Sequence, residues 1–328
     1  MYYQKAQYWT AKSRSDLVRL VTFTVGSSPP RVGALVDGDS KVVDLQAAHG
    51  RAYNGASPLL HSMMHVIEGG AEALGLIGEL LKARSPSVLL GREEVKLLAP
   101  VPLPPQMRDF LCFEKHLQQA FGAVAKLRGT EARIPRAWYE RPLFYHPNRF
   151  NVCGMDADVP WPAYTERLDF ELEFGCYIGR PGKDITKERA REHIFGYTIF
   201  NDFSARDEQT KEMAGQLGPG KGKDFDNGNA MGPCLVTADE IGDPYRLEMA
   251  VRVNGEEWGR GNSRDMHWKF EDCIAHASRS ETLHPGEFFG SGTVGNGCGL
   301  EHLRFLKPGD VVELEVEDVG ILRNRVVK

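Results

Sequence analysis

The sequence predicts an α+β protein rich in β-strands, in which a small N-terminal α/β unit precedes a larger, strand-rich domain. Short apolar runs separated by glycine and proline recur through the second part, and few helical segments interrupt them. This pattern favours a sheet-on-sheet or barrel-like core over a doubly wound sheet. Four prolines between Pro100 and Pro105 form a stiff, extended connector. We place the domain boundary there, between residues 1–104 and residues 105–328.

The N-terminal unit reads as a few strands followed by a helix. Residues 17–45 contain β-branched apolar runs, and Asp37-Gly38 is a typical hairpin dipeptide. Residues 58–84 have helical spacing and are rich in strong helix formers. We therefore expect a compact unit of short strands and one or two helices.

The larger part should hold many short strands and a few helices. The expected strands are Leu168–Ile178, Gly196–Phe200, Cys234–Thr237, Leu247–Val253, Val311–Val316 and Ile321–Val327. The expected helices cover residues 113–128, 186–192, 203–214 and 268–280.

Composition excludes several classes of protein. The 328 residues are 41% apolar and 26% charged with a net charge of −5, and no basic block suggests a nucleic-acid or anionic-membrane partner. Six scattered cysteines form no C-x-x-C pair, which argues against a zinc ribbon and favours reduced, buried thiols. The start Met1–Lys5 opens no apolar signal core, and no run reaches 18 apolar residues. We therefore expect a cytoplasmic protein.

Two glutamates alternate with apolar residues in Asp169-Phe-Glu171-Leu-Glu173-Phe. In a strand, side chains at i and i+2 point to the same face, so Glu171 and Glu173 should project together. Like charges held this close repel each other unless a cation lies between them, and oxygen ligands suit Mg²⁺, Ca²⁺ or Mn²⁺. The alternative is an edge strand with a solvated acidic face.

A second group follows in Asn201-Asp202-Phe-Ser-Ala-Arg206-Asp-Glu-Gln209. If the turn is helical, Asp202, Arg206 and Gln209 fall on one side at spacings of four and three. Such a set would suit a metal and a carboxylated substrate. The alternative is a surface helix that Asp202 caps, with an Asp202–Arg206 ion pair.

Glycine-rich segments supply further candidates. The segment from Gly215 to Lys221 resembles a phosphate loop in spacing, but Gly222 stands where Ser or Thr should hold magnesium. We therefore interpret it as a glycine-rich loop that brings a lysine, Lys223, close to a small ligand. Five glycines between Gly290 and Gly299 mark a second loop of close approach, with Thr293 inside it and Glu301 just after it. Asp109 and His116 open the second domain directly after the connector.

Taken in order, these motifs resemble those of the fumarylacetoacetate hydrolase family. The resemblance runs from about residue 105 to the C-terminus. The similarity rests on Glu171-Leu-Glu173, Asn201-Asp-Phe-Ser-Ala-Arg-Asp207, Leu217-Gly-Pro with Lys223, and Ser291-Gly-Thr293. The resemblance implies a mixed β-sandwich roll for the catalytic domain and pairing as a homodimer.

The resemblance also implies roles for these residues. The metal would be held by Asp109, Glu171, Glu173 and Asp202. His116 matches the general base, and Glu301 matches the acid that orients it. Around the substrate, Arg206, Gln209 and Lys223 match groups that face its carbonyls, and Thr293 and Tyr145 match further substrate contacts.

The implied activity is metal-dependent hydrolysis of a carbon–carbon bond in a β-diketo acid. An acylpyruvate or a fumarylacetoacetate-like product of aromatic catabolism would be the substrate, with Mg²⁺ as the first candidate metal and Mn²⁺ or Ca²⁺ as alternatives. Leu111 and Met213 stand where members that cleave fumarylacetoacetate itself carry tyrosines, which puts that substrate in question. Gln119 stands where decarboxylases carry a glutamate, which favours hydrolysis. The alternatives are an isomerase, decarboxylase or hydratase of a 2-oxo acid with the same site, or a non-catalytic binding protein.

Overall fold

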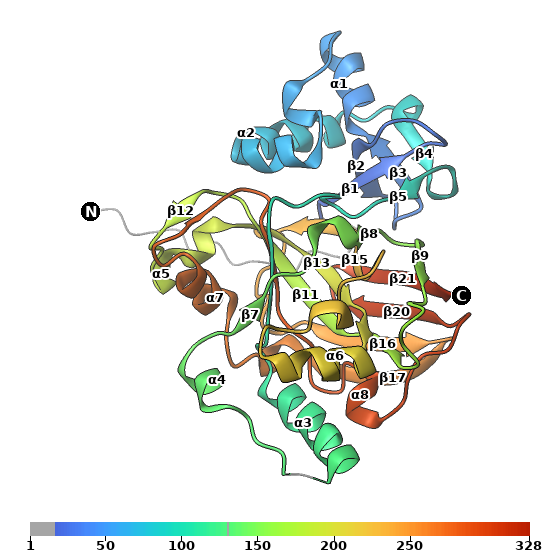
Figure 1. The fold of residues 1–328 in the computed structure, drawn as a ribbon. Helices are drawn as coiled ribbons and strands as arrows, with labels where there is room; N and C mark the ends of the chain where they lie inside the picture. Colours follow the sequence, from blue (N-terminus) through green and yellow to red (C-terminus); the bar gives the residue numbers. More distant parts are fainter. Residues whose placement is uncertain (1–16, 130) are drawn as a thin grey trace.

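The computed structural model describes residues 17–129 and 131–328 of the chain, so the expectation for Met1–Lys5 lies outside the described residues. A large mixed sheet and a second, smaller sheet pack against each other, and helices lie at both ends of the molecule (Figure 1). The α+β, strand-rich class expected from the sequence is therefore confirmed. Among the described residues, no helix is both long and apolar enough to cross a membrane.

The large sheet has twelve strands in the order β4-β3-β2-β1-β15-β13-β11-β19-β6-β7, with β5 beside β1 and β8 beside β15. Its strands are β1 (Arg19–Thr24), β2 (Arg31–Val36), β3 (Lys41–Asp44), β4 (Leu89–Gly91), β5 (Lys96–Leu97), β6 (Met107–Phe110), β7 (Phe144–Tyr145), β8 (Val152–Cys153), β11 (Leu172–Ile178), β13 (Ile194–Asp202), β15 (Asn229–Thr237) and β19 (Phe288–Gly290). Strands β11, β13 and β15 are buried along their whole length, as the central strands of a sheet covered on both faces should be.

The second sheet has five strands in the order β17-β16-β20-β21-β9. These are β9 (Asp158–Pro160), β16 (Glu248–Val253), β17 (Glu256–Asn262), β20 (Val311–Val316) and β21 (Gly320–Val327). In β20, Val312, Leu314 and Val316 are buried while the residues between them are half-exposed. This alternation places one face of the sheet on the core and the other toward solvent.

Two short ribbons and the helices complete the fold. The ribbons pair β10 (Leu168–Asp169) with β14 (Ser204–Ala205), and β12 (Gly182–Lys183) with β18 (Thr282–Leu283). The α-helices are α1 (Leu45–Tyr53), α2 (Met63–Lys82), α3 (Glu114–Arg128), α4 (Arg136–Glu140), α5 (Lys187–Ala190), α6 (Arg206–Glu212), α7 (Phe270–Ala277) and α8 (Gly299–His302). Short 3₁₀ turns occupy Pro58–Leu60, Pro86–Val88, Arg92–Glu94, Arg149–Asn151, Arg191–His193, Met213–Gly215, Gly220–Gly222 and Ser263–Asp265.

The N-terminal strands belong to the same sheet as the strands of the second part. Antiparallel pairing of β1 with β15 sets Arg19 opposite Val236 and Leu20 opposite Leu235. Leu20 and Leu235 are both buried among the residues that α1 and α2 cover. The two parts of the chain therefore share one sheet. The domain boundary between residues 104 and 105 stays a prediction.

One local expectation was wrong, and one alternative is excluded. Glu171 lies outside regular strands, in an isolated bridge with Cys298, because β10 pairs with β14 while β11 pairs with β13 and the chain changes partner between them. Asp202 does not cap α6, because the helix begins after Ala205 and Asp202 is the last residue of β13. The alternative of a capped surface helix is therefore excluded.

The pairing of β1 with β15 gives a stability prediction. Leu20→Ala should lower the free energy of unfolding by about 2–5 kcal/mol in a single cooperative transition, because the leucine is fully buried between the two parts. Urea unfolding followed by circular dichroism measures it. Leu217→Ala, which changes a side chain that is 98% exposed, is the matched control and should shift stability by no more than about 0.5 kcal/mol. A separate early transition in Leu20→Ala would mean that the N-terminal unit unfolds independently.

Candidate active site

Three buried carboxylates from neighbouring strands meet at one end of the large sheet. Asp109 lies on β6, Glu173 on β11 and Asp202 at the end of β13, and one oxygen of each lies within 4.8 Å of the others. Strand β19 brings β6 and β11 together, with Gly290 opposite Asp109. A Cβ at residue 290 would lie 2.4 Å from Oδ1 of Asp109, so only glycine leaves room for this carboxylate.

The electrostatics of this cluster fit a divalent cation. Burial first, and then the charge of Asp202, raise the pKa of Asp109 well above its ordinary value, and burial followed by the charge of Asp109 does the same to the pKa of Glu173. Oε2 of Glu173 and Oδ1 of Asp202 are buried without a hydrogen-bond donor among the described residues. Buried oxygens without donors, in a group of like charges, are the ligands that a hard cation takes.

Glu171 sits beside this cluster and is neutralised by two cations. Its Oε2 lies 2.5 Å from Nζ of Lys223, and its Oε1 lies 2.8 Å from a terminal nitrogen of Arg206. Burial alone would raise the pKa of Glu171, but the charges of Lys223 and Arg206 lower it to about 2. Lys223 also lies 2.6 Å from Oδ2 of Asp202, so it links Glu171 to the cluster. Glu171 is not among the three carboxylates within 4.8 Å, and its role as a fourth metal ligand stays a prediction.

Arg206 is fixed by a carboxylate that sequence reasoning left out of the site. Its Nε donates to Oδ2 of Asp169 at 2.7 Å, and Nη1 donates to Oε1 of Gln209 at 3.0 Å. Asp169 also accepts the backbone N–H groups of Gly299 and Leu300. The sequence could have indicated Asp169 as well, because it precedes Glu171 at the same i, i+2 spacing that separates Glu171 from Glu173. The Asp202–Arg206 pair considered from the spacing does not form, since Arg206 pairs with Asp169 and Glu171 instead.

A histidine and a glutamate form the second element of the site. Nδ1 of His116, in the first turn of α3, lies 3.0 Å from Oε1 of Glu301 on α8. The side chain of Glu301 is 0% exposed, and its other oxygen accepts the backbone N–H of Cys298 at 3.0 Å. The pair predicted from the sequence is therefore in contact, although 185 residues separate its members.

Tyr145 and Thr293 touch the carboxylates. The hydroxyl of Tyr145 donates to Oδ2 of Asp202 at 2.6 Å, and that of Thr293 lies 3.5 Å from Oε1 of Glu173. Burial first, and then the charge of Asp202, raise the pKa of Tyr145 well above its ordinary value, so the phenol remains a donor. Both side chains contact oxygens of the carboxylate cluster, and the predicted contacts with a substrate stay predictions.

All the candidate site residues except Asp202 and Glu301 line one cavity of about 280 Å³. Several of its lining residues lie on β6, α3 and α6, and Figure 1 shows α3 and α6 far from α1 and α2. Gly222 lets the Lys223 loop approach α6, because a Cβ there would lie 2.4 Å from the Cα of Gln209. The cavity thus brings Asp109, Glu171 and Glu173 together with His116, Arg206 and Lys223 in one space.

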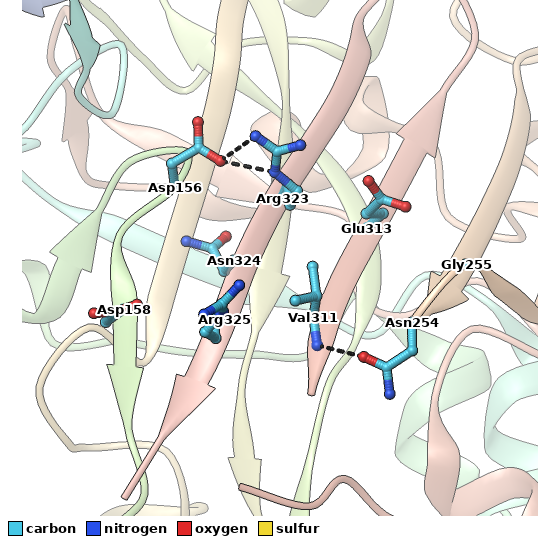
Figure 2. A pocket seen from close by; sticks show the side chains of 9 residues that line it. All are labelled: Asp156, Asp158, Asn254, Gly255, Val311, Glu313, Arg323, Asn324 and Arg325. Atoms are coloured by element: carbon cyan, nitrogen blue, oxygen red, sulfur yellow. Dashed lines mark hydrogen bonds and ion pairs between the residues drawn. The ribbon is translucent and has the colours of Figure 1, made fainter. Parts of the chain in front are cut away.

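A second hollow, of about 490 Å³, lies on the outer face of the smaller sheet (Figure 2). Figure 2 shows two of its contacts: Asp156 pairs with Arg323, and the side chain of Asn254 accepts the backbone N–H of Val311. It is the larger of the two hollows, but its described lining residues include no histidine and no cluster of buried charges. We therefore assign the chemistry to the 280 Å³ cavity.

Residues 106–327 match the model of the fumarylacetoacetate hydrolase C-terminal domain. The chain belongs to the fumarylacetoacetate hydrolase family. Among its relatives, the mitochondrial oxaloacetate tautomerase fahd2 of Xenopus laevis is 33% identical over 94% of this chain and 90% of its own length. The oxaloacetate tautomerase YisK of Bacillus subtilis is 33% identical over 90% of this chain and 95% of its own length.

Solved structures of this family share the fold. The fumarylacetoacetate hydrolase of Exiguobacterium antarcticum is 26% identical with a TM-score of 0.73, and the match covers 94% of this chain and 99% of that one. A probable 2-hydroxyhepta-2,4-diene-1,7-dioate isomerase of Mycobacterium abscessus is 26% identical with a TM-score of 0.71, over 95% of this chain and 98% of that one. The fold expected from the resemblance is confirmed, and the chain is a member of an enzyme family.

The carboxylate cluster predicts a metal-dependent gain in stability. Mn²⁺ at 100 times its dissociation constant should raise the free energy of unfolding of the EDTA-treated protein by about 2.7 kcal/mol, because the ion binds only the folded chain. Glu173→Gln should lose most of this gain. Without metal, the variant should be no less stable than the wild type, because it has one like charge fewer.

Thermal unfolding with and without Mn²⁺ measures both effects. Glu68→Gln, on the exposed face of α2, makes the same chemical change away from the site and should keep the full gain. A full Mn²⁺ effect in Glu173→Gln would exclude this carboxylate as a ligand.

Proposed function

We propose that this enzyme interconverts the keto and enol forms of a small 2-oxo acid with a divalent metal ion. The observation that carries the proposal is that His116, held by Glu301, lines the same cavity as Asp109 and Glu173 of the carboxylate cluster. Tautomerisation needs a base beside the carbon next to a polarised carbonyl, and these two elements supply both requirements.

The relatives support this reaction over the hydrolysis expected from the sequence. Both 33% identical relatives bear the name oxaloacetate tautomerase, and each aligns over 90% or more of this chain. The structure from Mycobacterium abscessus bears the name of a probable isomerase. These names agree with the alternative activity that the sequence left open.

The metal ion would be held by Asp109, Glu173 and Asp202, with Glu171 beside them. When bound, it would polarise the carbonyl of a chelating 2-oxo acid and stabilise negative charge on that oxygen. Tyr145 and Lys223 hold Oδ2 of Asp202 and leave Oδ1 for the ion.

The proton transfer is assigned to His116. Its Nδ1 faces Glu301, which leaves Nε2 for the substrate and keeps the ring oriented. Nε2 takes the proton from C3, the C–H electron pair becomes the C2–C3 double bond, and the carbonyl oxygen takes a proton to give the enol. One terminal nitrogen of Arg206, Nη2, lies close to Glu171 but makes no well-aligned hydrogen bond with it. This nitrogen can therefore donate a hydrogen bond to the substrate carboxylate.

Carbon–carbon hydrolysis of a β-diketo acid is the second candidate. It is favoured by the same His116–Glu301 pair, because a histidine backed by a carboxylate can also take a proton from water. The 26% identical fumarylacetoacetate hydrolase is consistent with it. A role in aromatic catabolism would follow from this candidate alone.

Three further expectations remain predictions. Mg²⁺ as the physiological ion rests on oxygen ligands that Mn²⁺ and Ca²⁺ also accept. Pairing as a homodimer rests on the family resemblance. The cytoplasmic location rests on the sequence, and relatives named as mitochondrial exist.

His116→Gln should lower kcat for tautomerisation by about 10²–10⁴-fold, because glutamine cannot take the proton. The affinity for Mn²⁺ should not change, since His116 is not one of the three clustered carboxylates. The decay of the enol absorbance of oxaloacetate measures the rate, and calorimetry measures metal binding. His302→Gln, exposed on α8, is the matched control. An unchanged rate in His116→Gln would exclude the proposed base.

The two candidate reactions differ in their products. With Mn²⁺ and acetylpyruvate in deuterated water, a tautomerase should exchange the C3 protons and leave the carbon chain intact. Hydrolysis would release acetate and pyruvate. Proton NMR of one sample separates these outcomes, and the appearance of both fragments would favour the second candidate.

A further inference from the structure

The 280 Å³ cavity has two ends of different chemistry. The carboxylates, Arg206 and Lys223 contact one another, and His116 is near enough to Glu171 to affect it electrostatically, so we call this group the head end. The rest of the wall is made mainly by the apolar side chains of Leu111, Leu117, Ala120, Phe121, Val124 and Leu143. The reaction proposed above uses only the head end, so the apolar walls have no role in it.

Helix α3 gives this apolar region its length. His116, Ala120 and Val124 lie at intervals of four residues and all line the cavity, so one face of the helix runs along it. Val124 follows His116 by eight residues, which corresponds to about 12 Å along the helix axis. The cavity therefore extends well past a ligand of three or four carbons bound at the head end.

The charges in the cavity lie only at the head end. Among the described lining residues, the side chains able to carry a positive charge are His116, Arg206 and Lys223, and all three already face carboxylates. A second carboxylate on a long substrate would lie against Phe121, Val124 and Leu143 without a partner. Burying an unpaired charge against apolar walls is strongly unfavourable.

Building on the proposed function, we infer that the site takes 2-oxo acids with an uncharged apolar arm in preference to dicarboxylic 2-oxo acids. The 2-oxo acid group binds at the head end, and the arm lies along α3 between Leu117 and Val124. A four-carbon diacid fills the head end only and leaves these walls in contact with water.

The expected gain follows from the apolar area buried. Each methylene added to the arm should strengthen binding about fourfold, which corresponds to about 0.8 kcal/mol per buried CH₂. The gain should stop once the arm passes Val124. A terminal carboxylate should cancel it, because that group loses water without gaining a partner.

The experiment uses the Mn²⁺-loaded full chain and two matched series of ligands. One series runs from 2-oxobutanoate to 2-oxooctanoate, and the other holds 2-oxo diacids of equal carbon number. Calorimetry measures the dissociation constants, and deuterium exchange at C3 measures turnover. The monoacids should bind about fourfold more tightly per methylene, and at least tenfold more tightly than the matched diacids at six carbons or more.

A charge placed on the wall should reverse the preference. Val124→Lys, at a half-buried position of α3, should strengthen binding of the longer diacids at least tenfold and weaken binding of the monoacids. Gln118→Lys adds the same charge on the exposed face of the same helix and should change neither series.

The readouts separate this inference from the proposed function. Tighter binding of monoacids without exchange at C3 would support the arm-binding wall and overturn the tautomerase. Exchange of oxaloacetate with no gain along the monoacid series, or equal binding of both series, would overturn the apolar-arm preference. An unchanged preference in Val124→Lys would also overturn it, since the wall would then lie outside the ligand's reach.

Discussion

The mutual repulsion of three buried carboxylates is the constraint on which this active site depends. Asp109, Glu173 and Asp202 come from three strands, and the hydrogen bonds of the sheet hold them within 4.8 Å of one another. The folded backbone keeps the three carboxylates close although their charges repel each other, and a bound cation would relieve this repulsion. The neighbouring hydroxyl of Tyr145 and ammonium of Lys223 satisfy one oxygen of Asp202 and leave the other in need of a partner.

Charge balance distinguishes Glu171 from the three clustered carboxylates. Lys223 and Arg206 lower the pKa of Glu171 to about 2 despite its burial, whereas burial and neighbouring carboxylates raise the pKa of Asp109 and of Glu173. Asp169 accepts a hydrogen bond from Nε of Arg206 and two more from backbone N–H groups at the start of α8. The same helix carries Glu301, so the anchor of Arg206 and the partner of His116 are built from one short segment.

The sequence predicted much of this arrangement, because periodicity and turn chemistry are local. The i, i+2 spacing of Glu171 and Glu173 correctly placed both side chains on one cavity, and the helix over residues 113–128 was found within one residue. The contact of His116 with Glu301 could be expected only from the family resemblance, since no local pattern links residues so far apart. The pairing of Arg206 with Asp169 rather than Asp202 depends on where β10 and β14 meet, which spacing along the chain does not encode. The shared sheet of the two parts was missed for the same reason.

The pairing of β1 with β15 has a consequence for how far the catalytic part could stand alone. The family match begins at residue 106, but β15 carries β1 on one side and β13, with Asp202 at its end, on the other. A chain shortened to the matched region would leave the backbone donors and acceptors of β15 open around Leu235 and Val236, where β1 pairs, while β8 would still cover Asn229 and Ala230 near Asp202. Open strand edges recruit other chains, so aggregation rather than a free-standing catalytic core would be the outcome of such a truncation.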